Sequence, residues 1–228
     1  MRELIMTQQT SKPYIGVGME GFIARWYAKS TKNDLDSFRT EARKVAADLK
    51  PGADVLEVAP GPGYFSIELA RLGPFKVTGL DISRTFVEIA QKNAGAHSVS
   101  VDFRQGNASA MPFGADSFDF IYCRAAFKNF SQPVGAINEM HRVLRPGGRA
   151  QIVDLRKDVS MDEINAYFKN SGRGWLDAMF TRLTFRTFLI KRAYTKQDFL
   201  DMAGKSRFGA CRMDVTSIGL AVHFEKLS

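Results

Sequence analysis

The chain has 228 residues, of which 45% are hydrophobic and 25% charged, and 32 basic against 24 acidic side chains give a formal net charge of +8. This balance is typical of a globular protein and excludes a disordered or fibrous chain. Two cysteines, Cys123 and Cys211, are too few for a disulfide framework or a four-cysteine zinc site, so we expect a reducing, cytoplasmic setting. No apolar run approaches the ~20 residues of a membrane-spanning helix, and residues 1–10 lack a signal-peptide pattern.

The middle of the chain, residues 51–155, alternates short apolar runs with stretches of helical period. It predicts strands at 55–58, 76–81, 99–104, 118–123 and 149–155, with helices beginning after Gly63, at Ser83 and at Pro133. The third of these helices is expected to end before Pro146-Gly147-Gly148. Strands that alternate with helices through short loops predict an α/β, Rossmann-like, doubly wound and mostly parallel sheet with both faces covered.

Two basic zones flank this core, and we expect all of them to form one domain. Residues 1–50 form an N-terminal helical cap that contains an amphipathic helix at 36–49, and residues 156–194 form a helical insertion opened by a capping box at Ser160–Glu163. Residues 195–228 predict a helix capped by Thr195, followed by two strands near 211–215 and 220–224. Consecutive terminal strands joined by a short turn predict an antiparallel edge, which brings the sheet to seven strands.

The most informative stretch is Leu56-Glu57-Val58-Ala59-Pro60-Gly61-Pro62-Gly63, between the first predicted strand and its helix. Glycine lets the backbone approach a ligand closely there, and ligands of doubly wound sheets bind beyond the strand ends. Asp81 follows Gly63 by 18 residues at the end of the second strand, where a carboxylate can accept both hydroxyls of a ribose. The alternatives are a tight turn that needs glycine for its dihedrals and an acid favoured by the helix dipole, although Ser83 already offers a cap.

Two classes of nucleotide ligand share this geometry. A dinucleotide fingerprint that starts at Gly61 would place its third glycine at Ser66, so that match fails at its last position. The other pattern is acidic-x-Gly-x-Gly-x-Gly, with Glu57 as the acid and Ala59 at the first glycine position. This stretch resembles motif I of the class I S-adenosylmethionine-dependent methyltransferases.

The resemblance covers most of the chain and is greatest to the ubiquinone/menaquinone-biosynthesis-like, small-molecule branch (methyltransferase type 11) of that superfamily. Five segments in the family order carry it: 57–63, 79–83, 106–113, 116–119 and 139–148. The family implies the fold predicted above and S-adenosylmethionine as cofactor.

The resemblance also implies a set of cofactor-binding residues. It assigns Glu57 and the backbone of Ala59, Pro60, Gly61 and Gly63 to the methionine part, Asp81 to the ribose, Ile82, Asn107 and Ala108 to the adenine, the main chain of Cys123 and Arg124 to the methyl-donor end, and Tyr14 and Tyr27 of the N-terminal cap to the donor side.

The chain departs from the family pattern at three places. Ala59 replaces a glycine, which a backbone with negative φ would tolerate, and Asn107 stands where the family often has aspartate. Phe127-Lys128-Asn129-Phe130 replaces a pair of histidines that many relatives carry after the fourth strand, so acceptor chemistry that depends on imidazole is not implied.

The expected function is in-line methyl transfer to a small, flat or hydrophobic organic acceptor. The cofactor supplies the reactive group, so no catalytic triad is needed, and the sequence indicates neither a catalytic residue nor a metal site. The aromatic insertion, with Phe180 and Phe188, is expected to select the acceptor.

Three alternatives remain open. The basic charge admits RNA or protein methylation, although it is diffuse and no nucleic-acid-binding module is legible. The glycine loop also admits a nucleotide-dependent oxidoreductase, or a cofactor-binding fold that transfers no methyl group.

Overall fold

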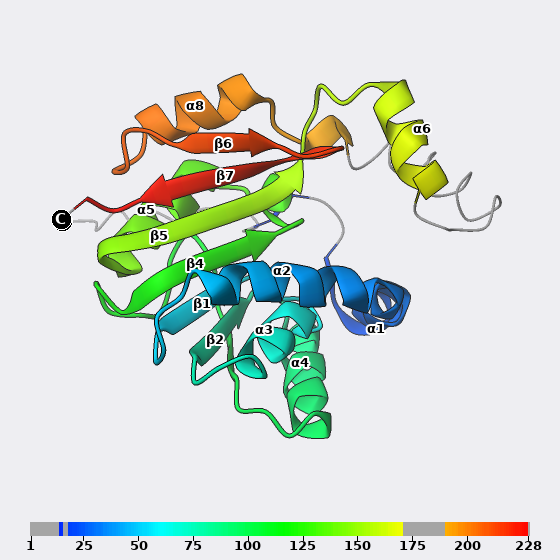
Figure 1. The fold of residues 1–228 in the computed structure, drawn as a ribbon, viewed down its shortest axis with the longest axis vertical. Coiled ribbons are helices and arrows are strands. Elements are labelled where there is room, and N and C mark those ends of the chain that lie inside the picture. Colours follow the sequence, from blue (N-terminus) through cyan, green and yellow to red (C-terminus); the bar gives the residue numbers. More distant parts are fainter. Residues whose placement is uncertain (1–13, 16–17, 171–189, 228) are drawn as a thin grey trace, which may run out of the picture.

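One seven-stranded sheet organises the molecule. The computed structural model describes residues 14–15, 18–170 and 190–227. The strand order is β3-β2-β1-β4-β5-β7-β6; β1 to β5 are parallel, and β7 runs antiparallel to both β5 and β6 (Figure 1). The predicted doubly wound sheet with an antiparallel C-terminal edge is therefore confirmed. The strands are β1 (Asp54–Val58), β2 (Lys76–Asp81), β3 (Asp102–Gln105), β4 (Phe118–Arg124), β5 (Leu144–Leu155), β6 (Arg212–Val215) and β7 (Gly219–Glu225).

Helices cover both faces of the sheet. They are α1 (Gly21–Thr31), α2 (Leu35–Ala47), α3 (Tyr64–Ala70), α4 (Arg84–Ala96), α5 (Pro133–Val143), α6 (Met161–Asn170) and α8 (Lys196–Gly204), with short 3-10 turns η1 (Lys32–Asp34), η2 (Phe127–Asn129) and η4 (Ile190–Arg192). Because successive side chains of a strand point to opposite faces, β1 places Val55 against α2 and α3, and Leu56 and Val58 against α5 and α8.

Local signals in the sequence fix several helix starts. Ser83 caps α4 by accepting a hydrogen bond from the Phe86 amide, and Thr195 and Asp198 form a complete capping box at α8. The predicted box at the start of α6 is also present, since Ser160 and Glu163 exchange backbone-to-side-chain bonds of 3.2 and 2.8 Å. These starts were predictable because each signal lies within three residues of the helix that it begins.

Two predicted strand boundaries are wrong. β3 begins at Asp102 rather than Val99, because the Val99 amide still donates to Ala94 at the end of α4. β5 begins at Leu144 rather than Arg149, and Pro146-Gly147-Gly148 lies inside it. The register against β4 shifts between Phe118 and Phe120, and Gly147 takes a φ of +76°, so the strand absorbs these residues as an irregularity.

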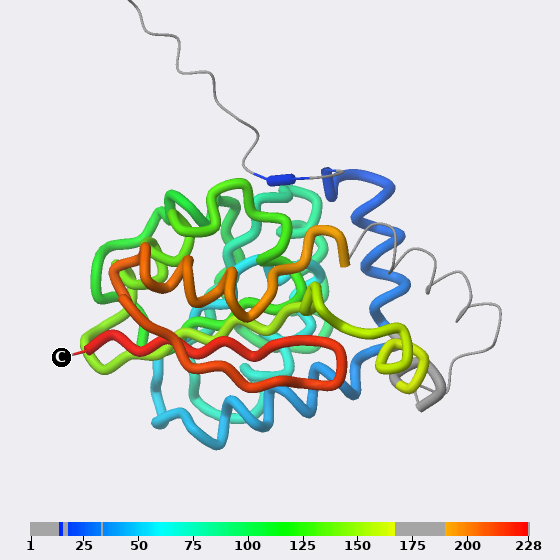
Figure 2. The backbone as a smooth tube through the Cα atoms, turned by 90° about the horizontal axis from the view of Figure 1, so that it is seen from above, coloured from blue at the N-terminus to red at the C-terminus, as the bar shows by residue number. Residues whose placement is uncertain are grey.

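Two helices lie beyond the carboxyl ends of β4 and β5. Figures 1 and 2 show α1 and α6 on that side of the sheet, away from the turn that joins α2 to β1. Within the described residues, no helix has the length and apolar character needed to cross a membrane. The N-terminal zone and the insertion thus place the helices α1 and α6 beside the carboxyl edge of the sheet.

Candidate functional site

The parallel register brings the loops after β1, β2 and β4 to one edge. Val58 pairs with Leu80 on one side and with Cys123 on the other, so the glycine loop starts between the ends of β2 and β4. The central position makes this edge the candidate site, as expected for a doubly wound sheet.

Alternate residues of the glycine loop take a left-handed backbone conformation. Ala59, Gly61 and Gly63 have φ values of +57°, +54° and +79°. The expectation that Ala59 has a negative φ is therefore wrong: its amide donates to the Leu80 carbonyl at 2.8 Å, a bond that ties this turn to the end of β2. A non-glycine residue in this region costs roughly 1–2 kcal/mol.

Gly61 and Gly63 differ in the space around them. A Cβ on Gly63 would lie 2.6 Å from the Phe103 ring and 2.9 Å from the Ala90 side chain, so close packing excludes any side chain there. A Cβ on Gly61 would meet no atom within 4 Å, so the loop is open at that point. Pro60, which precedes Gly61, is buried, and its carbonyl accepts the Gly63 amide at 3.0 Å.

Asp81 is a buried carboxylate without a cationic partner in the described part of the chain. It is 5% exposed, and its oxygens accept the backbone amides of Gly61 and Ser83, both at 2.9 Å. Burial raises the pKa of Asp81 to about 6, against these hydrogen bonds that lower it. The predicted end-of-strand position is confirmed, and the carboxylate lies directly against the open part of the glycine loop.

Glu57 is buried on the α3 side of β1. Its Oε2 accepts both the amide and the hydroxyl of Ser66, the amide at 3.0 Å, so it satisfies a backbone donor in the first turn of α3. Burial raises the pKa of Glu57 to about 7, although the Ser66 bonds and the Arg124 charge lower it. Every hydrogen bond of this carboxylate within the described residues uses Oε2.

The predicted adenine-side residues lie at the ends of β2 and β3. Ile82, Asn107 and Ala108 are each half-buried, and the Ile82 carbonyl accepts a bond from Gln105. The Asn107 Oδ1 accepts the Ser109 amide at 3.0 Å, so this side chain also stabilises its own turn. Ile82 follows Asp81 in the chain, and the Gly106 amide donates to the Asp81 carbonyl at 2.9 Å, so the segment that leads to Asn107 and Ala108 begins at the end of β2; their adenine role stays a prediction.

The end of β4 presents a buried thiol and a partly buried guanidinium. Cys123 is fully buried, and burial raises the pKa of its thiol well above the ordinary value, so the thiol stays protonated. The Arg124 guanidinium lies 4.6 Å from the Phe38 ring centroid and donates to Ser37 through Nη2 at 2.7 Å. Its Nη1 is buried and has no hydrogen-bond partner among the described residues.

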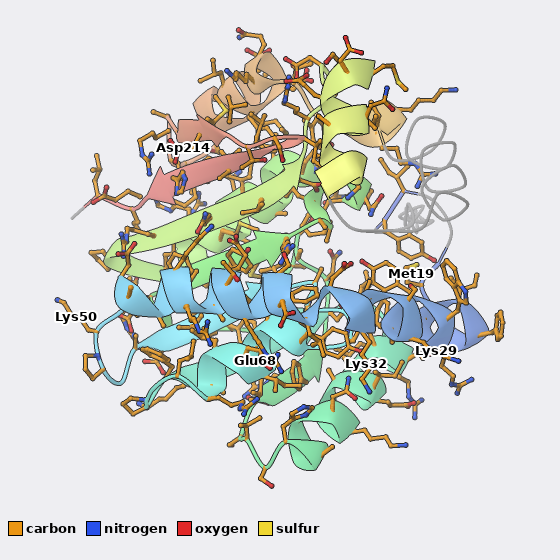
Figure 3. All side chains as sticks on the ribbon, turned by 45° about the vertical axis from the view of Figure 1, so that its right-hand side comes forward. Met19, Lys29, Lys32, Lys50, Glu68 and Asp214 are labelled. Atoms are coloured by element: carbon orange, nitrogen blue, oxygen red, sulfur yellow. The ribbon has the colours of Figure 1, made fainter. Side chains whose placement is uncertain are left out.

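An N-terminal strap, described at residues 14–15 and 18–21, crosses this edge. At one end the Ile15 amide donates to the Asn129 carbonyl at 2.7 Å, and Tyr14 pairs with Phe130. At the other end the Met19 carbonyl accepts the Ser83 hydroxyl. The two described parts of the strap are therefore held at the loop after β4 and at the start of α4; Figure 3 labels Met19.

Glu20 locks the far end of the strap onto α4. Its carboxylate accepts the amides of Arg84 and Thr85 at 3.0 and 3.1 Å and the Thr85 hydroxyl at 2.6 Å, and the Gly21 amide donates back to that hydroxyl. An acid at a helix N-terminus satisfies free amides and complements the dipole. Glu20 thus anchors the strap three and four residues beyond Asp81.

Tyr27 and Tyr64 connect α1 to α4 and α3. The Tyr27 ring packs edge-on against Phe86 at 5.8 Å, and burial raises the pKa of its phenol while the Arg124 charge lowers it. The Tyr64 hydroxyl donates to the Ala28 carbonyl at 2.8 Å from the first residue of α3. Of the two tyrosines predicted on the donor side, Tyr14 lies in the strap and Tyr27 on α1.

A buried ion pair lies at the ends of β4 and β5. The Lys128 Nζ is 2.9 Å from Asp154 Oδ1, and the two side chains are 4% and 2% exposed. Asp154 also accepts the amides of Lys128 and Leu155, while Nζ donates to the Ala125 carbonyl. The pair therefore holds the turn after β4, in which Ala125 takes a φ of +58°.

Sequence reasoning missed three groups at this edge: the Glu20 cap, the Tyr64 bond and the Lys128–Asp154 pair. Each joins residues separated by between 26 and 65 positions, so no local pattern marks it. A lysine within an apolar run after a predicted strand, Phe127-Lys128-Asn129-Phe130, was the one available signal for a buried cation.

A separate hollow of about 610 Å³ opens between α2 and the β5–β7 part of the sheet. Its lining includes Lys44, Arg149 and His223, and none of the predicted cofactor-binding residues. Within the described residues, no group of three or more His, Cys, Asp or Glu side chains is arranged to hold a metal ion. The predicted acceptor-selecting residues Phe180 and Phe188 lie outside the described residues.

Residues 56–152 match the family model of the methyltransferase domain. The demethylmenaquinone methyltransferase of Deinococcus radiodurans is 38% identical over 102 residues, which are 44% of this chain and 42% of that protein. The enzyme of the same name from Chlorobaculum parvum is 34% identical over 149 residues, or 64% and 59% of the two chains.

A third relative is the ubiquinone/menaquinone biosynthesis C-methyltransferase UbiE of Hahella chejuensis, 33% identical over 123 residues, or 52% and 49% of the two chains. This chain therefore spans about half the length of these relatives. Among solved structures, a candidate S-adenosyl-L-methionine-dependent methyltransferase of Methanococcus maripaludis superposes with a TM-score of 0.71 at 20% identity, covering 93% of this chain and 96% of that one. At that identity the superposition shows the fold alone.

Proposed function

We propose that this chain, whose residues 56–152 match the methyltransferase domain model, is an S-adenosylmethionine-dependent methyltransferase that transfers a methyl group to a small, flat or hydrophobic organic acceptor. One observation carries the proposal. The glycine loop, open at Gly61, and the buried Asp81 carboxylate lie against each other at the carboxyl edge of the sheet, where ligands of doubly wound sheets bind.

The residues at this edge fit a ligand that carries an ammonium, a carboxylate and a ribose. Asp81 offers an acceptor to ribose hydroxyls beside the open backbone of Gly61, and Glu57 suits an ammonium. The buried, unpartnered Nη1 of Arg124 suits a carboxylate. Ile82, Asn107 and Ala108 would then flank the adenine.

When bound, S-adenosylmethionine supplies an electrophilic methyl group on a sulfonium that leaves as a neutral thioether, so the leaving group needs no proton. The protein has to bind, orient and exclude water. The turn after Cys123, held by the Lys128–Asp154 pair, positions the main chain at the donor end. The strap, with Tyr14, and α1, with Tyr27, close the edge from the N-terminal side.

For the acceptor, the names of the relatives support a quinone-type ring methylated on carbon. The charge distribution supports a small molecule over RNA, because many guanidinium groups that could contact phosphates lie within 4.0 Å of carboxylates: those of Arg39, Arg71, Arg84, Arg104, Arg142, Arg145, Arg156 and Arg212. RNA-binding proteins concentrate free cations in a stripe instead.

The test is transfer of labelled methyl from S-adenosylmethionine, supplied near its dissociation constant, to lysate separated into metabolites, RNA and protein, with Asp81→Asn as the matched variant that binds the cofactor more weakly. Label in the metabolite fraction that is lost with Asp81→Asn supports the proposal, and reduced naphthoquinones are the first defined acceptors to try. Label confined to RNA or protein would show that the acceptor is a macromolecule and not a small molecule. Cofactor binding without label in any fraction contradicts methyl transfer.

A further inference from the structure

α1 carries large apolar side chains on its solvent side. Phe22 is 78% exposed and Trp26 is 59% exposed, whereas Ala24 and Ala28 on the opposite side are buried. Residues four positions apart lie on the same side of a helix, so the two aromatic rings form one continuous apolar patch. Scattered exposed apolar residues are ordinary in proteins, but two adjacent aromatic rings exposed to this degree on one helix are not.

Cations surround this aromatic patch. Arg25, Lys29 and Lys32 are all exposed, and none of them forms an ion pair within the described residues. Lys29 lies seven positions after Phe22, and Arg25 three positions after it, which places both beside the patch. Figure 3 labels Lys29 and Lys32 at this end of the molecule and Lys50 at the far end of α2.

We infer that the outer face of α1, defined by Phe22, Arg25, Trp26 and Lys29 together with Lys32 at the start of η1, docks on an anionic phospholipid surface. Charge complementarity selects this partner, because unpaired cations attract the negative headgroups while the aromatic rings enter the interface. Tryptophan and lysine or arginine together are the side chains that anchor proteins at this depth. α1 itself, Gly21–Thr31, contains no acidic residue that would oppose the attraction.

The inner side of α1 explains why the helix can present this face rigidly. Tyr64 donates to the Ala28 carbonyl at 2.8 Å, Tyr27 packs on Phe86, and Gly21 is bonded to Thr85. The helix is therefore fixed to α3 and α4 without using Phe22 or Trp26. An 11-residue helix buries little apolar area, so the docking is weak, reversible and dependent on anionic lipid.

Tryptophan fluorescence tests the contact directly, in the full chain with Trp175→Phe so that Trp26 is the single tryptophan. Addition of vesicles that contain phosphatidylglycerol should shift the Trp26 emission to shorter wavelength, and pure phosphatidylcholine vesicles should do so far less. High salt should reverse the shift. An emission that phosphatidylglycerol leaves unchanged overturns the proposal.

Vesicle co-flotation of variants separates the two parts of the face. Binding to phosphatidylglycerol vesicles should weaken by roughly a hundredfold in the combined variant Arg25→Gln, Lys29→Gln and Lys32→Gln, because each cation contributes about fivefold to the affinity. Phe22→Ser with Trp26→Ser should weaken it by about tenfold or more. The matched controls are Lys50→Gln, Lys76→Gln and Lys205→Gln combined, and Leu200→Ser with Val215→Ser, which remove exposed groups elsewhere and should leave binding unchanged.

Each other outcome contradicts the proposal. Equal losses of vesicle binding with the control variants would show that diffuse charge causes the binding. If the chain forms a dimer in the absence of vesicles, and Phe22→Ser with Trp26→Ser dissociates that dimer, the face binds a second copy of the chain instead. Binding of S-adenosylmethionine, measured by calorimetry in the same variants, should stay unchanged, so a failure of docking is distinguishable from a failure of the proposed activity.

Discussion

Two aspartates at the carboxyl edge are equally buried, and their partners differ. Asp81 and Asp154 are both 5% exposed, but Asp154 contacts the ammonium of Lys128, whereas the contacts of Asp81 are backbone amides. A buried carboxylate without a counter-charge is costly, and such groups concentrate where a ligand completes them. This difference indicates that the β1–β2 half of the edge, here called the ligand half, is built for a ligand. In the β4–β5 half, here called the completed half, the protein itself supplies the counter-charge.

The largest expected effect is on the completed half. Lys128→Met leaves the Asp154 charge buried without its partner, so the free energy of unfolding should fall by about 3–5 kcal/mol. Urea denaturation measures it. Lys128→Met combined with Asp154→Leu should recover most of the loss, because no uncompensated charge then remains. A single-variant loss below about 1 kcal/mol would show that the pair does not hold this turn.

The ligand half should lose affinity on substitution without losing stability. Asp81→Asn removes the charged acceptor offered to the ribose, so S-adenosylmethionine should bind about 10- to 100-fold more weakly, as expected for 1.5–3 kcal/mol per charged hydrogen bond. Calorimetry measures the dissociation constant, and Asp102→Asn on the exposed strand β3 is the matched control. An unchanged constant in the folded Asp81→Asn variant would refute the ribose role.

A pH series sharpens the comparison, since burial raises the pKa of Asp81 to about 6 and of Glu57 to about 7. Both carboxyls hold their protons more tightly when the chain is folded, so their contribution to stability rises as pH falls from about 7 toward about 4. Affinity for S-adenosylmethionine should run the opposite way and fall as pH drops below about 6, because the ionised acceptor is lost. Calorimetry at about pH 5 and about pH 8 checks this, and parallel trends in stability and affinity would contradict it.

The smallest expected effect is at Ala59, whose φ is +57°. Ala59→Gly relieves the left-handed strain and should raise the free energy of unfolding by up to about 1 kcal/mol, with cofactor affinity retained. Thermal denaturation measures the gain. Gly63→Ala is the informative counterpart, because its Cβ would meet the Phe103 ring and should destabilise the chain. Destabilisation by Ala59→Gly would show that the alanine methyl is itself needed in packing.

The same two halves show what the sequence can predict. The β1–β2 half was predictable because Glu57, the glycines and Asp81 lie in short segments whose strand, turn and cap signals are local. The backbone angle of Ala59 was not, since it depends on a bond to Leu80 on the neighbouring strand. The Lys128–Asp154 pair and the Glu20 cap join distant segments, so they emerge from packing alone.

Titration calorimetry of the unmodified chain with S-adenosylmethionine and, separately, with NAD tests the central claim most directly. The account predicts saturable binding of S-adenosylmethionine to one site and no binding of NAD. Saturable binding of NAD with no heat from S-adenosylmethionine would contradict it and assign the glycine loop to a dinucleotide.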